Sequence, residues 1–126
     1  MNFKNTLMDS LGIKMEKLNK DIVEMSMPVD KRTKQRFGFL HGGANVALAE
    51  TAASIGSLQH CDPEKTSVFG IEINANHVKT KKDGIVIAKA VPYHIGRKTM
   101  VWEVKIEDEN NKLISVARCT VGIVPN

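Results

Sequence analysis

The sequence predicts an α+β fold in which one long helix packs against an antiparallel β-sheet. Between Ala44 and Leu58 the chain is mainly apolar and has only one charged side chain, and it is long enough for a helix. The apolar segments on either side are shorter, have strand character and are separated by turn residues, which is typical of antiparallel neighbours. A length of 126 residues with 42% apolar residues suits one domain, residues 1–126, without a linker or repeat.

The N-terminal part is expected to form a short helix and a hairpin. A polar helix near Asn5–Ser10 precedes two strand-like segments that meet at the turn Asn19-Lys20. Pro28 ends the second strand, because proline cannot donate a hydrogen bond to a sheet ladder. The two strands are predicted at Ile13–Leu18 and Asp21–Met27, and an irregular segment follows at Val29–Leu40.

The long helix has recognisable ends. It begins near Gly42 or Gly43 and continues to Leu58 or Gln59, with Asp62-Pro63 closing it. It is the only long helix in the predicted order of two strands, one helix and four strands. The chain therefore has no second helix to cover the sheet, so we expect the outer face or the edge of the sheet to contact another subunit, in a dimer at least.

The remaining chain is predicted to form four strands joined by short turns. The apolar alternation is clearest at Met100, Trp102, Val104 and Ile106, whose side chains share one face of a strand. Asp83-Gly84, Ile95-Gly96 and Glu109-Asn110-Asn111 supply turn residues between these strands. The four strands are predicted at Thr66–Val78, Ile85–Tyr93, Thr99–Asp108 and Leu113–Val124.

The composition argues against several classes of partner. The net charge is +4, with basic residues at Lys31-Arg32-Lys34-Arg36 and at Lys79-Lys81-Lys82, and such runs are usually solvated surface. No recognition helix, zinc spacing or interleaved aromatic residues accompany them, so no nucleic acid is expected, whereas a phosphate-bearing small molecule is compatible. No segment approaches the roughly 20 apolar residues that span a bilayer and no signal peptide is apparent, so we expect a cytoplasmic protein without a membrane partner.

The cysteines and histidines show no site of their own. Cys61 and Cys119 form no CxxC pair and are expected to be reduced thiols. The histidines have no metal-ligand spacing with them, so no metal is expected.

Glu50 is the main sequence clue to function. It is the charged residue of the apolar helix, and on a helical wheel it lies among Val46, Ala49 and Ala53 rather than on an opposite polar face. Burying an unpaired carboxylate costs several kcal/mol, so such a residue usually has a partner or a catalytic task. An internal ion pair and a misjudged solvent face remain the structural alternatives.

Several segments of the chain, including the one that contains Glu50, resemble those of a known family. The segments MPVDKRTKQRFGFLHGGANVALAETAASIGS, GIEINANHVK and HIGRKTMVWEVKIEDENNKLISVARCT are similar to the hotdog-fold acyl-CoA thioesterases. The resemblance is to the small single-domain, phenylacetate-pathway type, which includes 4-hydroxybenzoyl-CoA thioesterase. The combination of Gln35, His41-Gly42-Gly43, Glu50 and Ser54 looks most like the branch of the 1,4-dihydroxy-2-naphthoyl-CoA hydrolases. The implied fold is a long central helix wrapped by an antiparallel sheet.

The resemblance implies a role for each of these residues. Gly42 would offer its backbone N–H to the thioester oxygen, with the Gln35 amide in the same region, because a helix N-terminus stabilises an oxyanion. Glu50 would attack the carbonyl carbon itself or activate a water molecule, and the sequence does not separate these roles. Ser54, one turn later on the same face, would bond the carboxylate or the water. His41 would be a donor near the thioester sulfur.

Several further residues are expected to contact substrate. Gly43 would let the ligand approach the backbone, although a tight loop before the helix also explains both glycines. His77 shares a face with Ile71, Ile73 and Ala75 and is expected to be a core or pocket-wall residue. The nucleotide end of coenzyme A needs basic side chains, which individually would otherwise be surface charges. The candidates are Lys79, Lys82, Arg97 and Lys98.

The resemblance implies hydrolysis of an acyl-CoA to a free acid and coenzyme A without a bound cofactor. The expected substrate is aromatic, with 1,4-dihydroxy-2-naphthoyl-CoA of menaquinone biosynthesis the leading candidate, and the expected assembly is a homotetramer made of two dimers. A broader hydrolase of phenylacetyl, hydroxybenzoyl or medium-chain acyl-CoA, or of acyl-carrier-protein thioesters, is the alternative within the class. A non-catalytic acyl-CoA-binding module is the alternative of another class.

Overall fold

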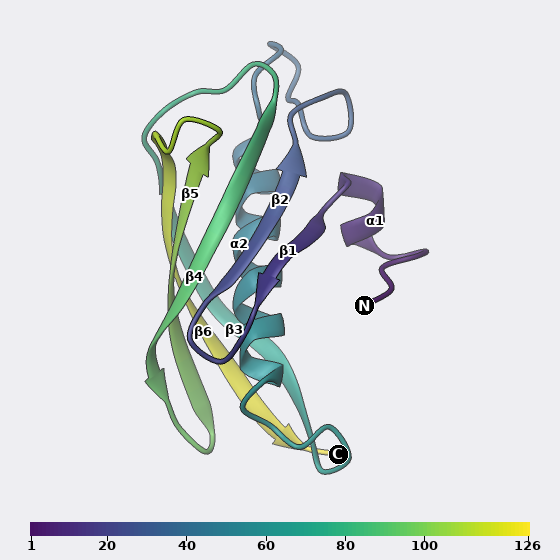
Figure 1. Cartoon of the computed structure of the whole chain (residues 1–126), viewed down its shortest axis with the longest axis vertical. Helices are drawn as coiled ribbons and strands as arrows, with labels where there is room; N and C mark the ends of the chain where they lie inside the picture. Colours follow the sequence, from purple (N-terminus) through teal and green to yellow (C-terminus); the bar gives the residue numbers. More distant parts are fainter.

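The computed structural model describes residues 1–126 and contains two helices and six strands. A short helix and a hairpin come first, then the long helix, then four strands, in the predicted order (Figure 1). Neither helix combines the length and the hydropathy of a membrane-spanning segment. The elements are α1 Leu7–Leu11, β1 Lys14–Leu18, β2 Val23–Pro28, α2 Gly42–Leu58, β3 Thr66–His77, β4 Ile85–Ile95, β5 Thr99–Asp108 and β6 Leu113–Pro125.

All six strands form one antiparallel sheet in the order β1-β2-β4-β5-β6-β3. The sheet therefore has two open edges. β1 is a short edge strand with a bulge between Met15 and Lys17. β3 is a long edge strand, and it carries the exposed apolar side chains Phe69 and Ile71. A long apolar edge is a template for pairing with another strand, so β3 is the edge at which such pairing is possible.

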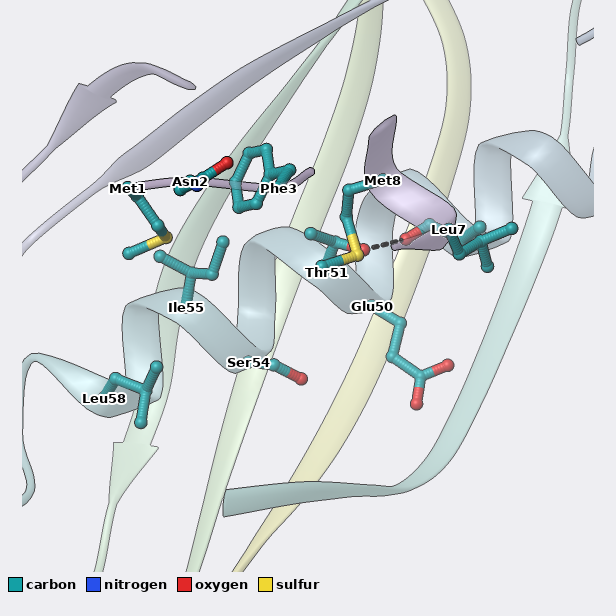
Figure 2. Close-up of a pocket in the computed structure, with 11 residues that line it drawn as sticks. Met1, Asn2, Phe3, Leu7, Met8, Glu50, Thr51, Ser54, Ile55 and Leu58 are labelled. Carbon is teal, nitrogen blue, oxygen red and sulfur yellow. Dashed lines mark hydrogen bonds between the residues drawn. The ribbon is translucent and has the colours of Figure 1, made fainter. Parts of the chain in front are cut away.

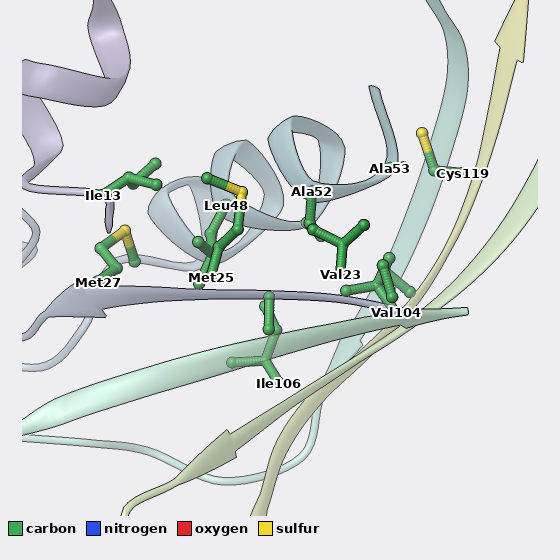
Figure 3. Packing of buried hydrophobic residues seen from close by; sticks show 14 of the residues in the cluster. Ile13, Val23, Met25, Met27, Leu48, Ala52, Ala53, Val104, Ile106 and Cys119 are labelled. Atoms are coloured by element: carbon green, nitrogen blue, oxygen red, sulfur yellow. The ribbon is translucent and has the colours of Figure 1, made fainter. Parts of the chain in front are cut away.

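The core lies between α2 and the concave face of the sheet. Leu48 and Ala52 of α2 point toward Val23 and Met25 of β2, and all four are fully buried (Figure 3). The predicted alternation of β5 is confirmed, since Met100, Trp102, Val104 and Ile106 are at most 1% exposed. The fold is therefore the predicted α+β arrangement of one long helix held in a curved antiparallel sheet.

One glycine is essential to the approach of helix and sheet. The Trp102 indole packs against Gly56 so closely that a Cβ there would stand 2.6 Å from the ring. Trp102 Nε1 donates a hydrogen bond of 2.8 Å to the hydroxyl of Ser57, which satisfies its polar end in the core. This contact fixes the C-terminal half of α2 on β5.

The opposite side of α2 is covered only in part. The N-terminal segment with Phe3 and Met8 packs against it and leaves a hollow over the middle of the helix. Glu50 and Ser54 are half-buried on this side, whereas Ala49 and Ala53 face the sheet and are fully buried. Glu50 therefore lies beside the apolar stripe of α2 and not within it.

The structure shifts several predicted boundaries. The short helix is Leu7–Leu11 rather than Asn5–Ser10, and it ends at Gly12 in the left-handed conformation with φ of 73°. β3 contains a bulge between Gly70 and Glu72, which separates Ile71 from the face shared by Ile73 and Ala75. The grouping of Ile71 with those residues, made on simple alternation, is therefore wrong because one extra residue at the bulge reverses the pattern.

Candidate active site

The start of α2 leaves one backbone N–H without an acceptor. His41 is the N-cap, and its Nδ1 accepts the N–H of Gly43 at 2.8 Å. The N–H groups of Ala44 and Asn45 bond to the His41 carbonyl. The N–H of Gly42 makes no hydrogen bond, so the first turn offers one donor at the positive end of the helix.

The His41 cap also fixes the proton position on its ring. Nδ1 accepts a hydrogen bond, so in this arrangement the neutral imidazole carries its proton on Nε2 and presents it outward as a donor. The Gly43 N–H is already used, and a Cβ on Gly43 would stand 2.9 Å from the His41 ring. Gly43 thus leaves room for the imidazole, and its contact with substrate stays a prediction.

His77, at the end of β3, lies directly over Gly42. A Cβ on Gly42 would stand 2.7 Å from His77 Nε2, so glycine is required for this approach. His77 Nδ1 is 2.8 Å from the hydroxyl of Ser115, which donates to the Asn76 carbonyl at 3.2 Å. The oriented His77 ring forms one wall of a small cavity of about 210 Å³, whose other residues are Leu40, Gly42, Asn45, Val78, Lys79 and Thr80.

Gln35 is brought to the same end of the molecule by a tight loop. Lys34 pairs with Leu40 as an isolated bridge, and the His41 N–H donates to the Thr33 carbonyl. Residues 33–35 therefore run back along residues 39–41, and Gln35 lies opposite Phe39, three residues before α2 begins. Its Oε1 accepts the Phe37 N–H, which leaves its amide N–H groups free to donate.

Glu50 and Ser54 line a different and larger cavity. Their side chains point to the same side of α2, as the i,i+4 spacing predicted, and no hydrogen bond joins them (Figure 2). The cavity has a volume of about 530 Å³ and mostly apolar walls. These walls come from the N-terminal segment and α2, with Met1, Asn2, Phe3, Leu7, Met8, Ala47, Thr51, Ile55 and Leu58.

The Glu50 carboxylate has no partner within the chain. It makes no salt bridge and accepts no hydrogen bond, so the internal ion pair considered from the sequence is absent. It lies against the backbone of Gly70 in β3, where a Cβ would overlap Oε2 and stand 2.8 Å from Cδ. Beneath it, burial and then the charges of Glu50 and Glu72 raise the pKa of the Cys119 thiol to about 12, so this cysteine stays protonated and inert.

Glu50 and Gly42 of one chain do not face a common point. Eight residues of helix separate them, which is about 12 Å along the axis. The two cavities share no lining residue. A reacting carboxylate must come within about 3–3.5 Å of the carbonyl carbon, and a carbonyl whose oxygen bonds the Gly42 N–H is beyond the reach of Glu50 in the same chain. In the single chain, Glu50 and the free Gly42 N–H therefore line two separate cavities.

Known proteins resemble this chain over nearly its whole length. The family model described as the thioesterase superfamily matches residues 37–115. The chain belongs to the thioesterase superfamily. A Bacillus subtilis protein named as a candidate esterase is 48% identical over 98% of both chains. The 1,4-dihydroxy-2-naphthoyl-CoA hydrolase of Listeria monocytogenes is 44% identical over 93% of this chain and 94% of its own.

Solved structures agree with the family. A mutant thioesterase from Pseudomonas aeruginosa superposes with a TM-score of 0.95 and 41% identity, covering 98% of this chain and 88% of that one. The fold is accordingly the hotdog fold of these thioesterases, and the enzyme is a thioester hydrolase.

The four basic candidates of this thioesterase lie at opposite ends of α2. Lys79 is at the cavity beside Gly42, and Lys82 lies over the Phe39 ring at 5.2 Å. Arg97 lines a hollow with His60 and Cys61, beyond the C-terminal end of the helix, and Lys98 follows it in the β4–β5 turn. Because α2 is about 25 Å long, the two pairs do not converge within one chain.

Sequence reasoning missed three kinds of site residue. Phe3 and Met8 belong to the large cavity because the N-terminal segment folds back onto α2, which no local pattern announces. Gly70 sets the position of the Glu50 carboxylate through the register of β3. Asn45 is a buried polar residue in an apolar helix, so the reasoning applied to Glu50 could have found it.

Proposed function

We propose that this thioesterase hydrolyses an aromatic acyl-CoA, with 1,4-dihydroxy-2-naphthoyl-CoA the leading candidate, in a site assembled from two copies of the chain. The observation that carries the proposal is the apolar cavity beside a carboxylate without a partner. The Listeria relative bears the name of that hydrolase and supports the choice of substrate.

The cavity over α2 suits a flat apolar acyl group. Its volume of about 530 Å³ is within the range of small-molecule pockets, and Phe3, Met8 and Ile55 give it apolar walls. The Thr51 hydroxyl is bonded to the Ala47 carbonyl at 2.6 Å, so Glu50 and Ser54 are the polar side chains that α2 offers to a ligand. An acyl group in this cavity would place its carbonyl carbon next to Glu50.

A second copy of the chain would complete the site. The open edge of β3 can pair antiparallel with the β3 of another copy, which places the two α2 helices side by side in opposite directions. Glu50 and Ser54 of one copy would then face Gly42, His41 and Gln35 of the other. The same pairing brings opposite ends of the two chains together, so that Lys79 and Lys82 of one meet Arg97 and Lys98 of the other around the coenzyme A phosphates.

Such a site allows two routes of thioester hydrolysis, each of which balances. As a general base, Glu50 takes a proton from water, the water oxygen bonds the carbonyl carbon, and the oxyanion is held by the Gly42 N–H. As a nucleophile, Glu50 bonds the carbon itself and gives a mixed anhydride that water cleaves. In both cases the carbon–sulfur bond breaks, and the outward Nε2–H of His41 would donate a hydrogen bond to the departing thiolate.

A substrate panel tests the proposal. Free-thiol release is measured with naphthoyl, benzoyl, phenylacetyl and medium-chain acyl-CoA, each with the wild type and with Glu50→Gln. The expected result is a preference for aromatic acyl groups and a loss of about 10²–10⁴ in kcat for the variant, with an unchanged melting temperature because Glu50 has no partner to lose. A preference for medium-chain acyl groups would overturn the aromatic assignment. Binding of acyl-CoA without any thiol release would favour the non-catalytic module.

Mixed oligomers test the shared site. Glu50→Ala and Gln35→Ala chains are each expected to be inactive alone, and refolding them together should restore part of the activity, because one hybrid site then has both residues. A mixture as inactive as its components would contradict a site shared between copies. The assembly we expect is a homotetramer of two such dimers, and the location we expect is the cytoplasm.

A further inference from the structure

Asn45 is a buried polar side chain without a partner. It is 3% exposed in the first turn of α2, and its Oδ1 is a buried oxygen that makes no hydrogen bond. Asparagine is a poorer helix former than alanine, and an unsatisfied buried acceptor destabilises a fold. The chain therefore places an unfavourable residue among the alanines of α2, which calls for a partner outside the chain.

The surroundings of Asn45 indicate what that partner is. Asn45 lines the small cavity together with Gly42, whose N–H is free, and with His77, and Leu40 and Val78 are the apolar residues of its lining. The cavity thus combines two apolar side chains with several polar groups, including Lys79 and Thr80. An amide side chain has one acceptor and two donors, which is complementary to a secondary amide.

The spacing agrees with the arm of coenzyme A. Asn45 follows Gly42 by three residues, a rise of about 4.5 Å along α2. In a thioester of coenzyme A, two methylene groups connect the sulfur to the first amide N–H of the pantetheine arm. A carbonyl oxygen held by the Gly42 N–H thus places that amide about one helical turn away.

We propose that Asn45 is a positioning residue that accepts a hydrogen bond from the pantetheine amide nearest the thioester sulfur. This inference rests on the proposed function, since it takes the Gly42 N–H as the site of the thioester oxygen. Asn45 would then hold the thiol portion in place and make the enzyme prefer thioesters of amide-bearing thiols, whether the thiol is coenzyme A or an acyl-carrier phosphopantetheine.

Three benzoyl thioesters separate this role from a structural one. The thiols are coenzyme A, N-acetylcysteamine, which keeps the first amide, and pentanethiol, which has the same chain length without an amide. The measured quantity is the ratio of kcat/KM for the N-acetylcysteamine thioester to that for the pentanethiol thioester. Asn45→Ala should lower this ratio by about 5- to 100-fold, the scale for leaving one polar group unpaired, and Asn45→Ser, which keeps an acceptor, should recover part of it. Gln59→Ala, at the far end of α2, is the matched control and should leave the ratio unchanged.

The outcomes are distinguishable. The melting temperature of Asn45→Ala should equal or exceed that of the wild type, because no bond within the chain is lost. An unchanged ratio would overturn the role of Asn45 while leaving the proposed function intact. An equal loss on all three thioesters with a lower melting temperature would make Asn45 a structural residue, for example one that holds a buried water. A wild type that releases thiol from none of the three would instead refute the proposed function.

Discussion

Replacing Gly70 by alanine moves the Glu50 carboxylate without removing it. The added methyl group would overlap Glu50 Oε2 and stand 2.8 Å from Cδ. Ordinary carbon contacts lie at about 3.5–4.0 Å, so the carboxyl group has to move by about 1 Å. The Glu50 side chain is flexible and has no bonded partner, so it can move while the backbone of β3 keeps its place.

The consequence for catalysis is larger than the consequence for folding. A misplacement of about 1 Å at a reacting group can cost about 10²-fold in rate, so Gly70→Ala should lower kcat by that order. The cost to the free energy of unfolding should stay below about 1 kcal/mol, because only a half-exposed side chain end is displaced. Free-thiol release from an aromatic acyl-CoA gives kcat, and thermal unfolding gives the stability.

A double variant supplies the control. In the Glu50→Gln background, Gly70→Ala should have almost no further effect on kcat, since the carboxylate that it displaces is already gone. Equal effects of Gly70→Ala in both backgrounds would refute the reasoning, because the glycine would then act through β3 or the subunit contact. Near-normal kcat in the single variant would show that the position of Glu50 in the structure is not the reactive one.

Three further predictions follow from the edge strand, the basic residues and the surface ion pairs. Ile71→Lys, on the open edge of β3, should shift the sedimentation profile toward monomer and lower activity together, and an active monomer would contradict the shared site. Arg97→Ala should raise KM with little change in kcat, and the difference in KM from the wild type should shrink with added salt. Hydrolysis of a truncated substrate without the nucleotide should be unaffected. If its hydrolysis is impaired as much as that of the full acyl-CoA, Arg97 serves folding. The hydrogen bond from Lys81 holds the pKa of Glu109 at about 2, below its ordinary 4.5. The pair therefore contributes stability above pH 4.5 that is lost as the pH falls toward 2. Over that window the melting temperature of Glu109→Gln should fall less than that of the wild type, and parallel curves for both proteins would refute the contribution.

The local pattern of the sequence determined the order and type of the elements. The apolar run with a lone carboxylate predicted α2, and the alternation through Trp102 predicted the buried face of β5, because both signals depend only on neighbours a few residues away. The spacing of Glu50 and Ser54 likewise placed both side chains on one face of the helix. The resemblance carried by Gln35, His41 and Glu50 gave the family that the comparisons confirm.

Only the tertiary structure decided how these residues meet. The bulge at Gly70 turned Ile71 outward and put the β3 backbone against Glu50, an effect of strand register that alternation alone does not contain. The folding back of Phe3 onto α2 created the large cavity. The length of α2 separated Glu50 from the free N–H of Gly42, so two residues of one motif line two separate cavities in the folded chain. Such contacts depend on sheet curvature and long-range packing, which are set by the whole chain rather than by any one segment of it.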